Sequence, residues 1–330
     1  MSKSILVTGG AGFIGSHYIR YLLRQYPDIE IWNLDALTYS GNLYNLKDVE
    51  KDERYHFIHA NLCKQEDVSA LFEHQKIDEV VHFAAESHVD RSIYGATPFI
   101  ETNIKGTFHL LEASLKADVQ KFVHVSTDEV YGSFPVGMAV EDTLLAPKNP
   151  YSASKASSDL LCLSYQHTYG MPVVISRCTN NYGPNQYPEK LIPFSIKNLL
   201  CDKPIPIYGD GKQQRDWIHV YDHCRGLDLI RQGGREGEIY HIGAENTVTN
   251  LEIALKLLDI MDKPNTLIDH VQDRLGHDVR YALDTQKIRK ELQFQPSISF
   301  AEGLKDTVYW YLEHEDWWDT VRNPYQVEEK

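Results

Sequence analysis

The chain has 330 residues, of which 42% are hydrophobic and 24% charged, and this length and composition suit one large or two closely packed globular domains. Its formal net charge of −14 argues against a nucleic-acid partner, and an anionic ligand would need local positive potential. No apolar run approaches the length of a membrane span or of a secretory signal, so we expect no membrane partner.

The first half alternates short apolar runs with longer amphipathic ones, as βαβ units do. Six runs are predicted strands: Ser4–Thr8, Glu30–Leu34, Tyr55–His59, Glu79–Phe83, Lys121–Ser126 and Val173–Arg177. Four segments are predicted helices: Gly12–Gln25, Glu66–His74, Pro98–Lys116 and Tyr151–Tyr169. This order predicts an α/β fold with a Rossmann-type, doubly wound parallel sheet, whose function lies at the carboxyl ends of the strands.

Beyond residue 180 the pattern changes and turns become denser. Helices are predicted at Leu191–Leu200, Tyr221–Arg231, Leu251–Met261 and Ala301–Tyr311, with short strands at Ile218–Val220 and Glu238–Ile242. We therefore expect a Rossmann domain over residues 1–180 and a smaller C-terminal α/β substrate-binding domain over residues 181–330. A return of the chain to the first sheet near residues 238–243 is one option.

Glycines cluster directly after the first predicted strand, in Gly9-Gly10-Ala11-Gly12-Phe13-Ile14-Gly15. Both G-x-x-G-x-x-G and G-x-G-x-x-G fit, and such spacing allows a tight turn and close approach of the backbone to a pyrophosphate. Asp35, at the end of the next strand, is placed to accept hydrogen bonds from the adenosine ribose, which favours NAD over NADP. The alternatives are an ordinary strand–turn–helix junction and a cap by Asp35 for the loop Ala36–Gly41.

A second cluster opens the helix that follows the fifth predicted strand. Asn149-Pro150 is a cap and first-turn pair, so Tyr151 and Lys155 would lie one turn apart on one helix face. An ammonium near a phenol lowers the phenol pKa, which makes Tyr151 a candidate base near neutral pH. On an isolated surface helix this spacing would carry no function, but after a nucleotide-binding fold it indicates catalysis.

The run Thr8-Gly-Gly-Ala-Gly-Phe-Ile-Gly15, together with Tyr151-x-x-x-Lys155, resembles the extended short-chain dehydrogenase/reductase family. The resemblance covers essentially the whole chain and implies tightly bound NAD, a nucleotide-sugar substrate and a homodimer. Asn61 stands where relatives commonly carry Asp. The implied cofactor contacts are Gly9, Gly12, Phe13, Ile14, Gly15, Asp35, Thr38, Asn61, Leu62, Ala84, Ala85, Thr102, Tyr151 and Lys155.

The run Ser126-Thr-Asp-Glu-Val-Tyr-Gly132 narrows the chemistry, because it resembles the members of this family that remove water from dTDP-glucose. Loss of water across carbons 5 and 6 needs a base and an acid, and two neighbouring carboxyl groups with separated pKa values provide both. The resemblance implies that Tyr151 takes the proton of the carbon-4 hydroxyl and that Thr127 hydrogen-bonds there. It implies further that Glu129 removes the carbon-5 proton and Asp128 protonates the leaving hydroxyl.

Several alternatives stay open for this run. Asp128 and Glu129 would form a solvated turn if the segment had no catalytic role. A UDP-sugar 4-epimerase or a sugar-acid decarboxylase of the same family needs no acid at carbon 6. A non-catalytic nucleotide sensor is the third alternative. The base of the nucleotide stays open between thymine, uracil and cytosine.

Further loops that resemble the family imply the substrate contacts. Arg215 and Arg274 would pair with the diphosphate and so provide the local positive potential, although a surface ion pair is the alternative for each. The five scattered cysteines predict free thiols in a cytoplasmic protein, and no histidine spacing predicts a metal site. The implied substrate-binding residues are Ser87, Thr127, Asn181, Lys190, Arg215, Asn250, Arg274 and His277.

Overall fold

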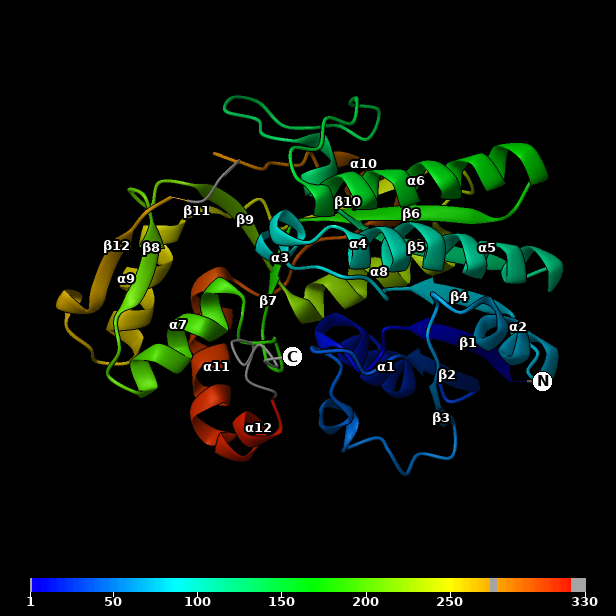
Figure 1. Ribbon diagram of the computed structural model, residues 1–330, viewed down its shortest axis with the longest axis horizontal. Coiled ribbons are helices and arrows are strands. Elements are labelled where there is room, and N and C mark those ends of the chain that lie inside the picture. Colours follow the sequence, from blue (N-terminus) through cyan, green and yellow to red (C-terminus); the bar gives the residue numbers. More distant parts are fainter. Residues whose placement is uncertain (1, 274–277, 322–330) are drawn as a thin grey trace.

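The computed structural model describes residues 2–273 and 278–321, and its elements form two lobes (Figure 1). The strands of the larger lobe are β1 Lys3–Thr8, β2 Ile29–Asp35, β3 Tyr55–His59, β4 Glu79–His82, β5 Lys121–Thr127, β6 Val173–Cys178 and β10 Ile239–Ile242. They form one sheet in the order β10-β6-β5-β4-β1-β2-β3, and every neighbouring pair is parallel. The predicted doubly wound parallel sheet is confirmed, and its six predicted strands differ from the observed ones by at most one residue at either end.

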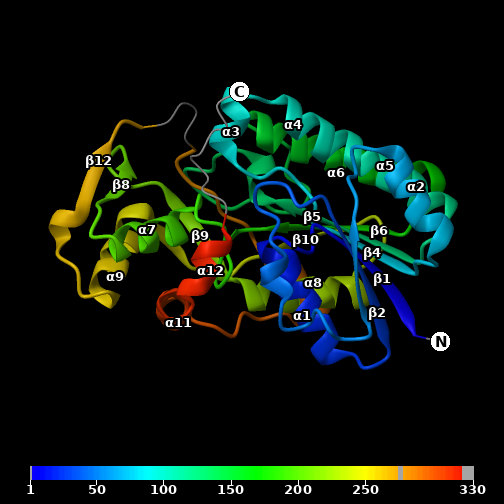
Figure 2. The same ribbon diagram turned by 60° about the horizontal axis from the view of Figure 1, so that its bottom comes forward.

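Helices cover both faces of this sheet (Figure 2). On one face, Leu6 of β1 packs in a buried cluster with Leu111, and on the other face Val7 packs with Leu22 and Leu227. Successive strand residues therefore point into two separate cores, as a sheet covered on both sides requires. The first face carries α2 Gln65–His74, α5 Thr107–Lys116 and α6 Pro150–Tyr169, and the second carries α1 Phe13–Gln25, α8 Val220–Gly233 and α10 Gln286–Leu292.

The segment predicted as one helix over Pro98–Lys116 is not regular. It consists of the short α4 Thr97–Phe99, a π-helix over Ile100–Gly106, and then α5. Within the π-helix, the buried Asn103 side chain accepts from the backbone N–H of Glu86 at 2.8 Å and donates to the Ser154 hydroxyl at 2.8 Å. The irregular turn thereby ties a loop after β4 to α6, and π-turns of this kind often occur at functional sites.

The smaller lobe lies at the other end of the molecule, on the left in Figure 1. It holds a three-stranded sheet of β11 Thr247–Thr249, β9 Gln214–His219 and β7 Asn180–Tyr182, and a parallel pair of β12 Ile268–Val271 and β8 Ile205–Tyr208.

The predicted strand Ile218–Val220 was wrong in its bounds. Val220 already begins α8, because the His219 side chain accepts from Tyr221 N and caps that helix. The helices of the smaller lobe are α7 Leu191–Leu200, α9 Asn250–Ile260, α11 Phe300–Glu313 and α12 Glu315–Thr320, whereas α3 Val89–Tyr94 packs against α6 of the larger lobe.

The chain passes between the lobes more than once. It enters the smaller lobe at β7 and β9, returns to the sheet layers of the larger lobe for α8 and β10, and then leaves again for β11. β10 pairs in parallel with β6, from Ile239 opposite Ile175 to Ile242 opposite Cys178. Over the described residues, no helix has both the length and the apolar character that a membrane span requires.

Candidate active site

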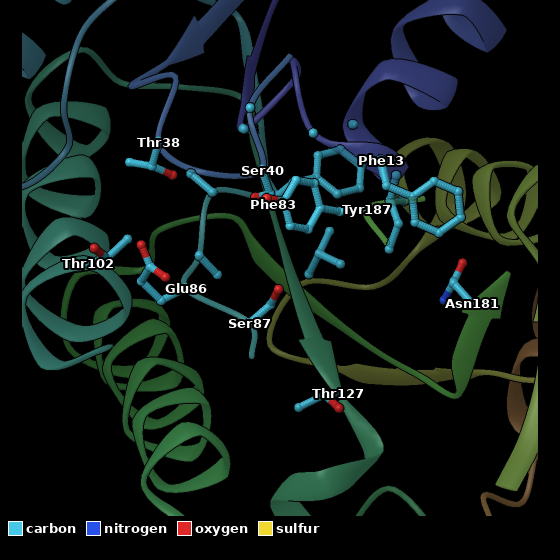
Figure 3. Close-up of a pocket in the computed structure, with 18 of the residues that line it drawn as sticks. Phe13, Thr38, Ser40, Phe83, Glu86, Ser87, Thr102, Thr127, Asn181 and Tyr187 are labelled. Atoms are coloured by element: carbon cyan, nitrogen blue, oxygen red, sulfur yellow. The ribbon is translucent and has the colours of Figure 1, made fainter. Parts of the chain in front are cut away.

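A cavity of about 330 Å³ lies at the carboxyl ends of the central strands, where an open parallel sheet places its ligands. Figure 3 shows Thr127 at the end of β5, with Ser87 and Asn181 reaching the same space from other segments. All the predicted cofactor and catalytic residues belong to its wall, together with four of the eight predicted substrate residues, of which Thr127 is also a predicted catalytic residue. These wall residues are Gly9, Gly12, Phe13, Ile14, Gly15, Asp35, Thr38, Asn61, Leu62, Ala84, Ala85, Ser87, Thr102, Thr127, Asp128, Glu129, Tyr151, Lys155, Asn181 and Lys190.

The glycine turn between β1 and α1 leaves no room for side chains. Gly9 has a φ of +71°, and a Cβ there would lie 2.7 Å from the backbone N of Ala84. A Cβ on Gly15 would lie 2.4 Å from the carbonyl oxygen of Gly9. α1 then begins at Phe13, with Gly12 at its cap position, and it has neither a side-chain cap nor an acidic residue in its first turn. Its first N–H groups and the positive end of its dipole fit a pyrophosphate, so these residues suit the predicted dinucleotide.

Asp35 caps a loop and also lines the cavity. Its Oδ2 accepts from Ala11 N at 2.9 Å, and its Oδ1 accepts from Leu37 N at 2.8 Å. The carboxylate therefore caps the loop after β2 and holds the glycine turn, while it also lines the cavity. Burial raises the pKa of Asp35, and these two backbone hydrogen bonds oppose the rise.

Asp128 lies in the 3-10 turn Asp128–Tyr131 after β5 and is 3% exposed, so the alternative of a solvated turn is wrong for this residue. Burial, followed by the charge of Glu129, raises the pKa of Asp128 to about 8. Its Oδ1 accepts from the Thr127 hydroxyl at 3.2 Å, while Oδ2 has no hydrogen-bond partner within the described part of the chain. Asp128 is thus a carboxylic acid at neutral pH, with one oxygen available to a ligand.

Glu129 is tied to the start of α6. Its Oε2 accepts from Nδ2 of Asn149 at 3.5 Å, and its backbone N donates to the Thr127 hydroxyl at 3.3 Å. Asn149 also caps α6, since its Oδ1 accepts from Ser152 N at 2.8 Å, and Pro150 follows in the first turn. The predicted cap is confirmed, and the cap residue also positions a predicted catalytic carboxylate.

Tyr151 and Lys155 lie one turn apart on α6, and both line the cavity. Burial, followed by the charge of Glu129, raises the pKa of Tyr151 well above its usual range, while a hydrogen bond with Thr127 opposes this rise. The Lys155 ammonium donates to the carbonyl oxygen of Val125 at 2.8 Å, and burial lowers its pKa. The sequence predicted that Lys155 lowers the pKa of Tyr151. In the structure the pKa of Tyr151 is raised instead, and the Lys155 ammonium is bonded to a backbone carbonyl oxygen.

The predicted substrate residues divide into three groups. Ser87, Asn181 and Lys190 line the cavity, and the Lys190 ammonium donates to the Ser87 carbonyl oxygen at 2.7 Å. The Arg215 guanidinium lies behind the wall, where it donates to the Asp278 carbonyl oxygen at 2.9 Å, but its charge still opposes the rise in the Asp128 pKa. Asn250 begins α9 and does not line the cavity, and Arg274 and His277 lie outside the described residues.

Sequence reasoning missed a group of side chains in the cavity wall. Glu86, Tyr187 and Glu189 all line it, and Glu189 accepts a hydrogen bond from the Tyr39 hydroxyl at 3.0 Å. The Arg91 side chain lies 3.6 Å from Glu189, and burial raises the pKa of this carboxyl group. The position of Glu189 next to the predicted Lys190 was the one feature of the sequence that could have indicated it.

Known proteins resemble this chain over nearly its full length. The family described as GDP-mannose 4,6 dehydratase matches residues 6–307. A dTDP-glucose 4,6-dehydratase of Streptomyces niveus is 48% identical over 324 residues, which cover 97% of this chain and 96% of the relative. The solved dTDP-glucose 4,6-dehydratase of Streptomyces venezuelae, with NAD and TYD bound, is 51% identical with a TM-score of 0.94, over 97% of this chain and 100% of that chain.

A second solved structure, the dTDP-glucose 4,6-dehydratase of Bacillus anthracis in complex with NAD, is 44% identical with a TM-score of 0.91. The match covers 97% of this chain and 100% of that one. The resemblance inferred from the glycine turn, the Thr-Asp-Glu run and the Tyr–Lys pair is therefore confirmed. The chain belongs to the GDP-mannose 4,6-dehydratase family.

Proposed function

We propose that this protein is an NAD-dependent lyase that converts dTDP-glucose to dTDP-4-keto-6-deoxyglucose and water. The observation that carries the proposal is the buried Asp128, whose pKa of about 8 makes it an acid at neutral pH, directly beside Glu129 in the cavity wall. An elimination of water needs such an acid, whereas a 4-epimerase or a decarboxylase does not. The names of relatives about half identical to this chain support the same substrate and reaction.

When bound, NAD would supply a hydride acceptor at carbon 4 and a hydride donor at carbon 6 of the sugar, together with the positive charge of its oxidised ring. The glycine turn and the start of α1 would hold the pyrophosphate, and Asp35 would accept from the adenosine ribose. Asn61, Leu62 and Thr102 would surround the adenosine end of the cofactor. Tyr151 and Lys155 would lie at the nicotinamide end.

Tyr151 would act on the hydroxyl of carbon 4 and take its proton as carbon 4 becomes a ketone. A phenol whose pKa is raised stays protonated at neutral pH, so Tyr151 can take this proton only where its deprotonated form is stabilised. The hydrogen bond with Thr127 stabilises that form, and the positive charge of an oxidised nicotinamide ring would add to the effect. The Thr127 hydroxyl, which donates to Asp128 in this structure, would turn to hydrogen-bond at carbon 4 when the sugar is bound. The Lys155 ammonium, fixed on the Val125 carbonyl, adds a positive charge at the same end of the cavity.

The ketone at carbon 4 acidifies the proton on carbon 5, and Glu129 would remove that proton. The electron pair of the broken C–H bond forms the double bond between carbons 5 and 6, while the C–O bond at carbon 6 breaks. Asp128 would give its proton to the departing hydroxyl, which leaves as water. When carbon 6 receives the hydride, carbon 5 receives a proton from Glu129 that has exchanged with solvent, which restores the Glu129 carboxylate. Asp128 has then lost one proton and Tyr151 has gained the proton of the carbon-4 hydroxyl, so release of a proton by Tyr151 and uptake of one by Asp128 through solvent close the cycle.

Incubation of the purified protein with dTDP-glucose in deuterium oxide tests this function. We expect a 4-keto-6-deoxy product with deuterium at carbon 5, and no net conversion of NAD to NADH. A parallel assay with UDP-glucose shows whether the protein prefers thymine or uracil as the nucleotide base of its substrate. A product without deuterium, or full turnover by a Glu129→Gln variant, would instead favour the 4-epimerase or decarboxylase alternatives.

Three further assignments belong to this proposal. Residues 1–180 would serve mainly the cofactor and residues 181–330 the nucleotide sugar. A homodimer is supported by exposed apolar side chains on the adjacent α5 and α6, namely Phe108, Leu160 and Tyr169. Light scattering checks it, and a Leu160→Glu variant should be monomeric. A cytoplasmic location is supported by the five cysteines, all of which are free thiols.

A further inference from the structure

Asn45 connects the glycine turn to the smaller lobe. It lies in the 3-10 turn Leu43–Leu46 between β2 and β3, and its side chain is buried, with the residue 2% exposed. Its Nδ2 donates to the carbonyl oxygen of Ala11 at 3.0 Å, and its Oδ1 accepts from the indole N–H of Trp317 at 2.8 Å. One side-chain amide therefore bonds to the middle of the glycine turn and to the last described helix, α12.

The neighbouring residues repeat this connection. The backbone N of Asn42 also donates to the Ala11 carbonyl oxygen, at 3.0 Å, and its side chain donates to the Thr320 hydroxyl at 2.8 Å. The Tyr44 hydroxyl hydrogen-bonds Asp316. Since three residues of this short segment each bond to α12, the contact is an extended one between the lobes and not a single chance approach.

The Ala11–Gly12 peptide is held at both of its polar atoms. Its carbonyl oxygen accepts from Asn42 and Asn45, and its N–H donates to the Gly9 carbonyl oxygen at 3.2 Å. Because a peptide is planar, these bonds fix the direction in which the chain enters α1. The first N–H groups of α1 are the ones that would receive the pyrophosphate, so their orientation depends on these bonds.

We propose that Asn45 is a positioning residue for the glycine turn, and that its bond to Trp317 couples retention of the dinucleotide to occupancy of the nucleotide-sugar lobe. The inference rests on the proposed function, in which the cofactor must stay bound between the two hydride transfers. A ligand that orders the smaller lobe would strengthen the α12 contact and thereby hold the turn. By linkage, the dinucleotide would strengthen binding of the nucleotide sugar to the same degree.

Two variants separate the halves of this connection. Asn45→Ala removes both side-chain bonds of Asn45, whereas Trp317→Phe keeps an aromatic ring and the bond from Asn45 to Ala11 but loses the bond from Asn45 to the smaller lobe. Trp318→Phe is the matched control, because the Trp318 indole N–H donates to the Tyr311 carbonyl oxygen at 3.2 Å, within the smaller lobe. The measurement is the dissociation rate of NADH, followed by its fluorescence during a chase with NAD, with and without dTDP, alongside the melting temperature.

We expect Asn45→Ala to release NADH ~3- to 10-fold faster than the unmodified protein, the effect of about one hydrogen bond. Trp317→Phe should lose most of the slowing that dTDP produces in the unmodified protein, and Trp318→Phe should keep it. If Trp317→Phe keeps the unmodified NADH rates and dTDP effect, the coupling is overturned, and this variant decides the question even if Asn45→Ala does not fold. Equal effects of Trp317→Phe and Trp318→Phe on NADH release would also overturn the coupling, because they would show that either change loosens the smaller lobe as a whole. A failure of the unmodified protein to bind NADH or dTDP would instead count against the proposed function.

Discussion

The two ends of the cavity are built from opposite kinds of residue. At the cofactor end, the site depends on side chains that are missing, because a Cβ on Gly9 or Gly15 would strike the backbone. At the reaction end, it depends on side chains that are buried, since burial is the largest cause of the raised pKa values of Asp128 and Tyr151. The cofactor end can therefore be recognised from the spacing of its glycines in the sequence, whereas the pKa values at the reaction end depend on how the rest of the protein packs around the side chains.

This contrast predicts that changes at the reaction end stop chemistry and leave binding intact. The largest effect is expected for Tyr151→Phe, which removes the phenol oxygen but keeps the buried ring against Phe99. We expect kcat to fall by ~10²–10⁴-fold, the usual contribution of a general base. The NAD content and the melting temperature should change little. Tyr309→Phe, on the exposed face of α11, is the control for loss of a phenol elsewhere.

Changes at the cofactor end should weaken NAD binding and leave the chemical step largely intact. Gly15→Ala places a Cβ 2.4 Å from the Gly9 carbonyl oxygen, so the turn must shift. We expect NAD affinity to fall by ~10- to 100-fold, as for overpacking of a rigid site, with kcat largely restored by saturating NAD. Gly95→Ala serves as the control, because a Cβ at Gly95 meets nothing within 4 Å. Unchanged NAD affinity in Gly15→Ala would remove the distinction between the two ends.

The pH dependence should belong to the reaction end. Asp128 acts in its protonated form, so dehydration should persist below pH 8 and decline as the pH rises through its pKa of about 8. Because this pKa is raised on folding, the stability that the proton contributes is fully present below the usual pKa of Asp and is lost as the pH rises toward 8.

Asp128→Asn should show low activity at every pH, and its melting temperature should change less than that of the unmodified protein between about pH 6 and 9. Asp269→Asn, on the surface, should keep the unmodified pH profile. Rate profiles and thermal melts across this range provide the measurement. A rate that rises steadily through pH 8 would contradict the acid role of Asp128.

The smallest effect is expected for Asn61→Asp, at the adenosine end. The Asn61 Oδ1 already accepts from Cys63 N at 2.9 Å, and an aspartate oxygen can accept the same bond. We expect NAD affinity to change by less than about twofold, as for substitutions that keep their local contacts. Titration calorimetry with NAD checks this. A tenfold change would mean that the Asn61 side chain meets the adenine directly.

Much of the fold and the cofactor end could be predicted, because those features are local. The strand order follows from alternating βα units, and the glycine turn and the Asn149 cap are set by residues close together in the chain. The π-helix could not be predicted from apolar periodicity, since it depends on the bonds of Asn103 to segments 17 and 51 residues away. The carbonyl partner of Lys155 is equally a product of tertiary packing, 30 residues away in sequence.

Tertiary packing also accounts for Glu189, which the sequence analysis missed, and for the different surroundings of the predicted residues Asp128 and Glu129. Glu189 reaches the cavity because its turn is fastened to Tyr39, 150 residues earlier in the chain. Asp128 and Glu129 are neighbours of similar chemistry, yet Asp128 is buried while Glu129 is only partly so. Their different environments follow from α6 and the smaller lobe, and no local pattern distinguishes them.

The return of the chain at α8 and β10 has a consequence for dissection of this protein. An expressed fragment ending near residue 180 would lack the edge strand beside β6 and the helix that covers α1, so Val174 and Leu22 would face water. A fragment that starts near residue 180 would contain α8 without β1 and α1, against which its apolar face packs. Neither piece should fold alone. Since α10 also returns to the larger lobe, genetic exchange of the sugar-binding lobe between relatives would have to transplant three separated stretches of sequence.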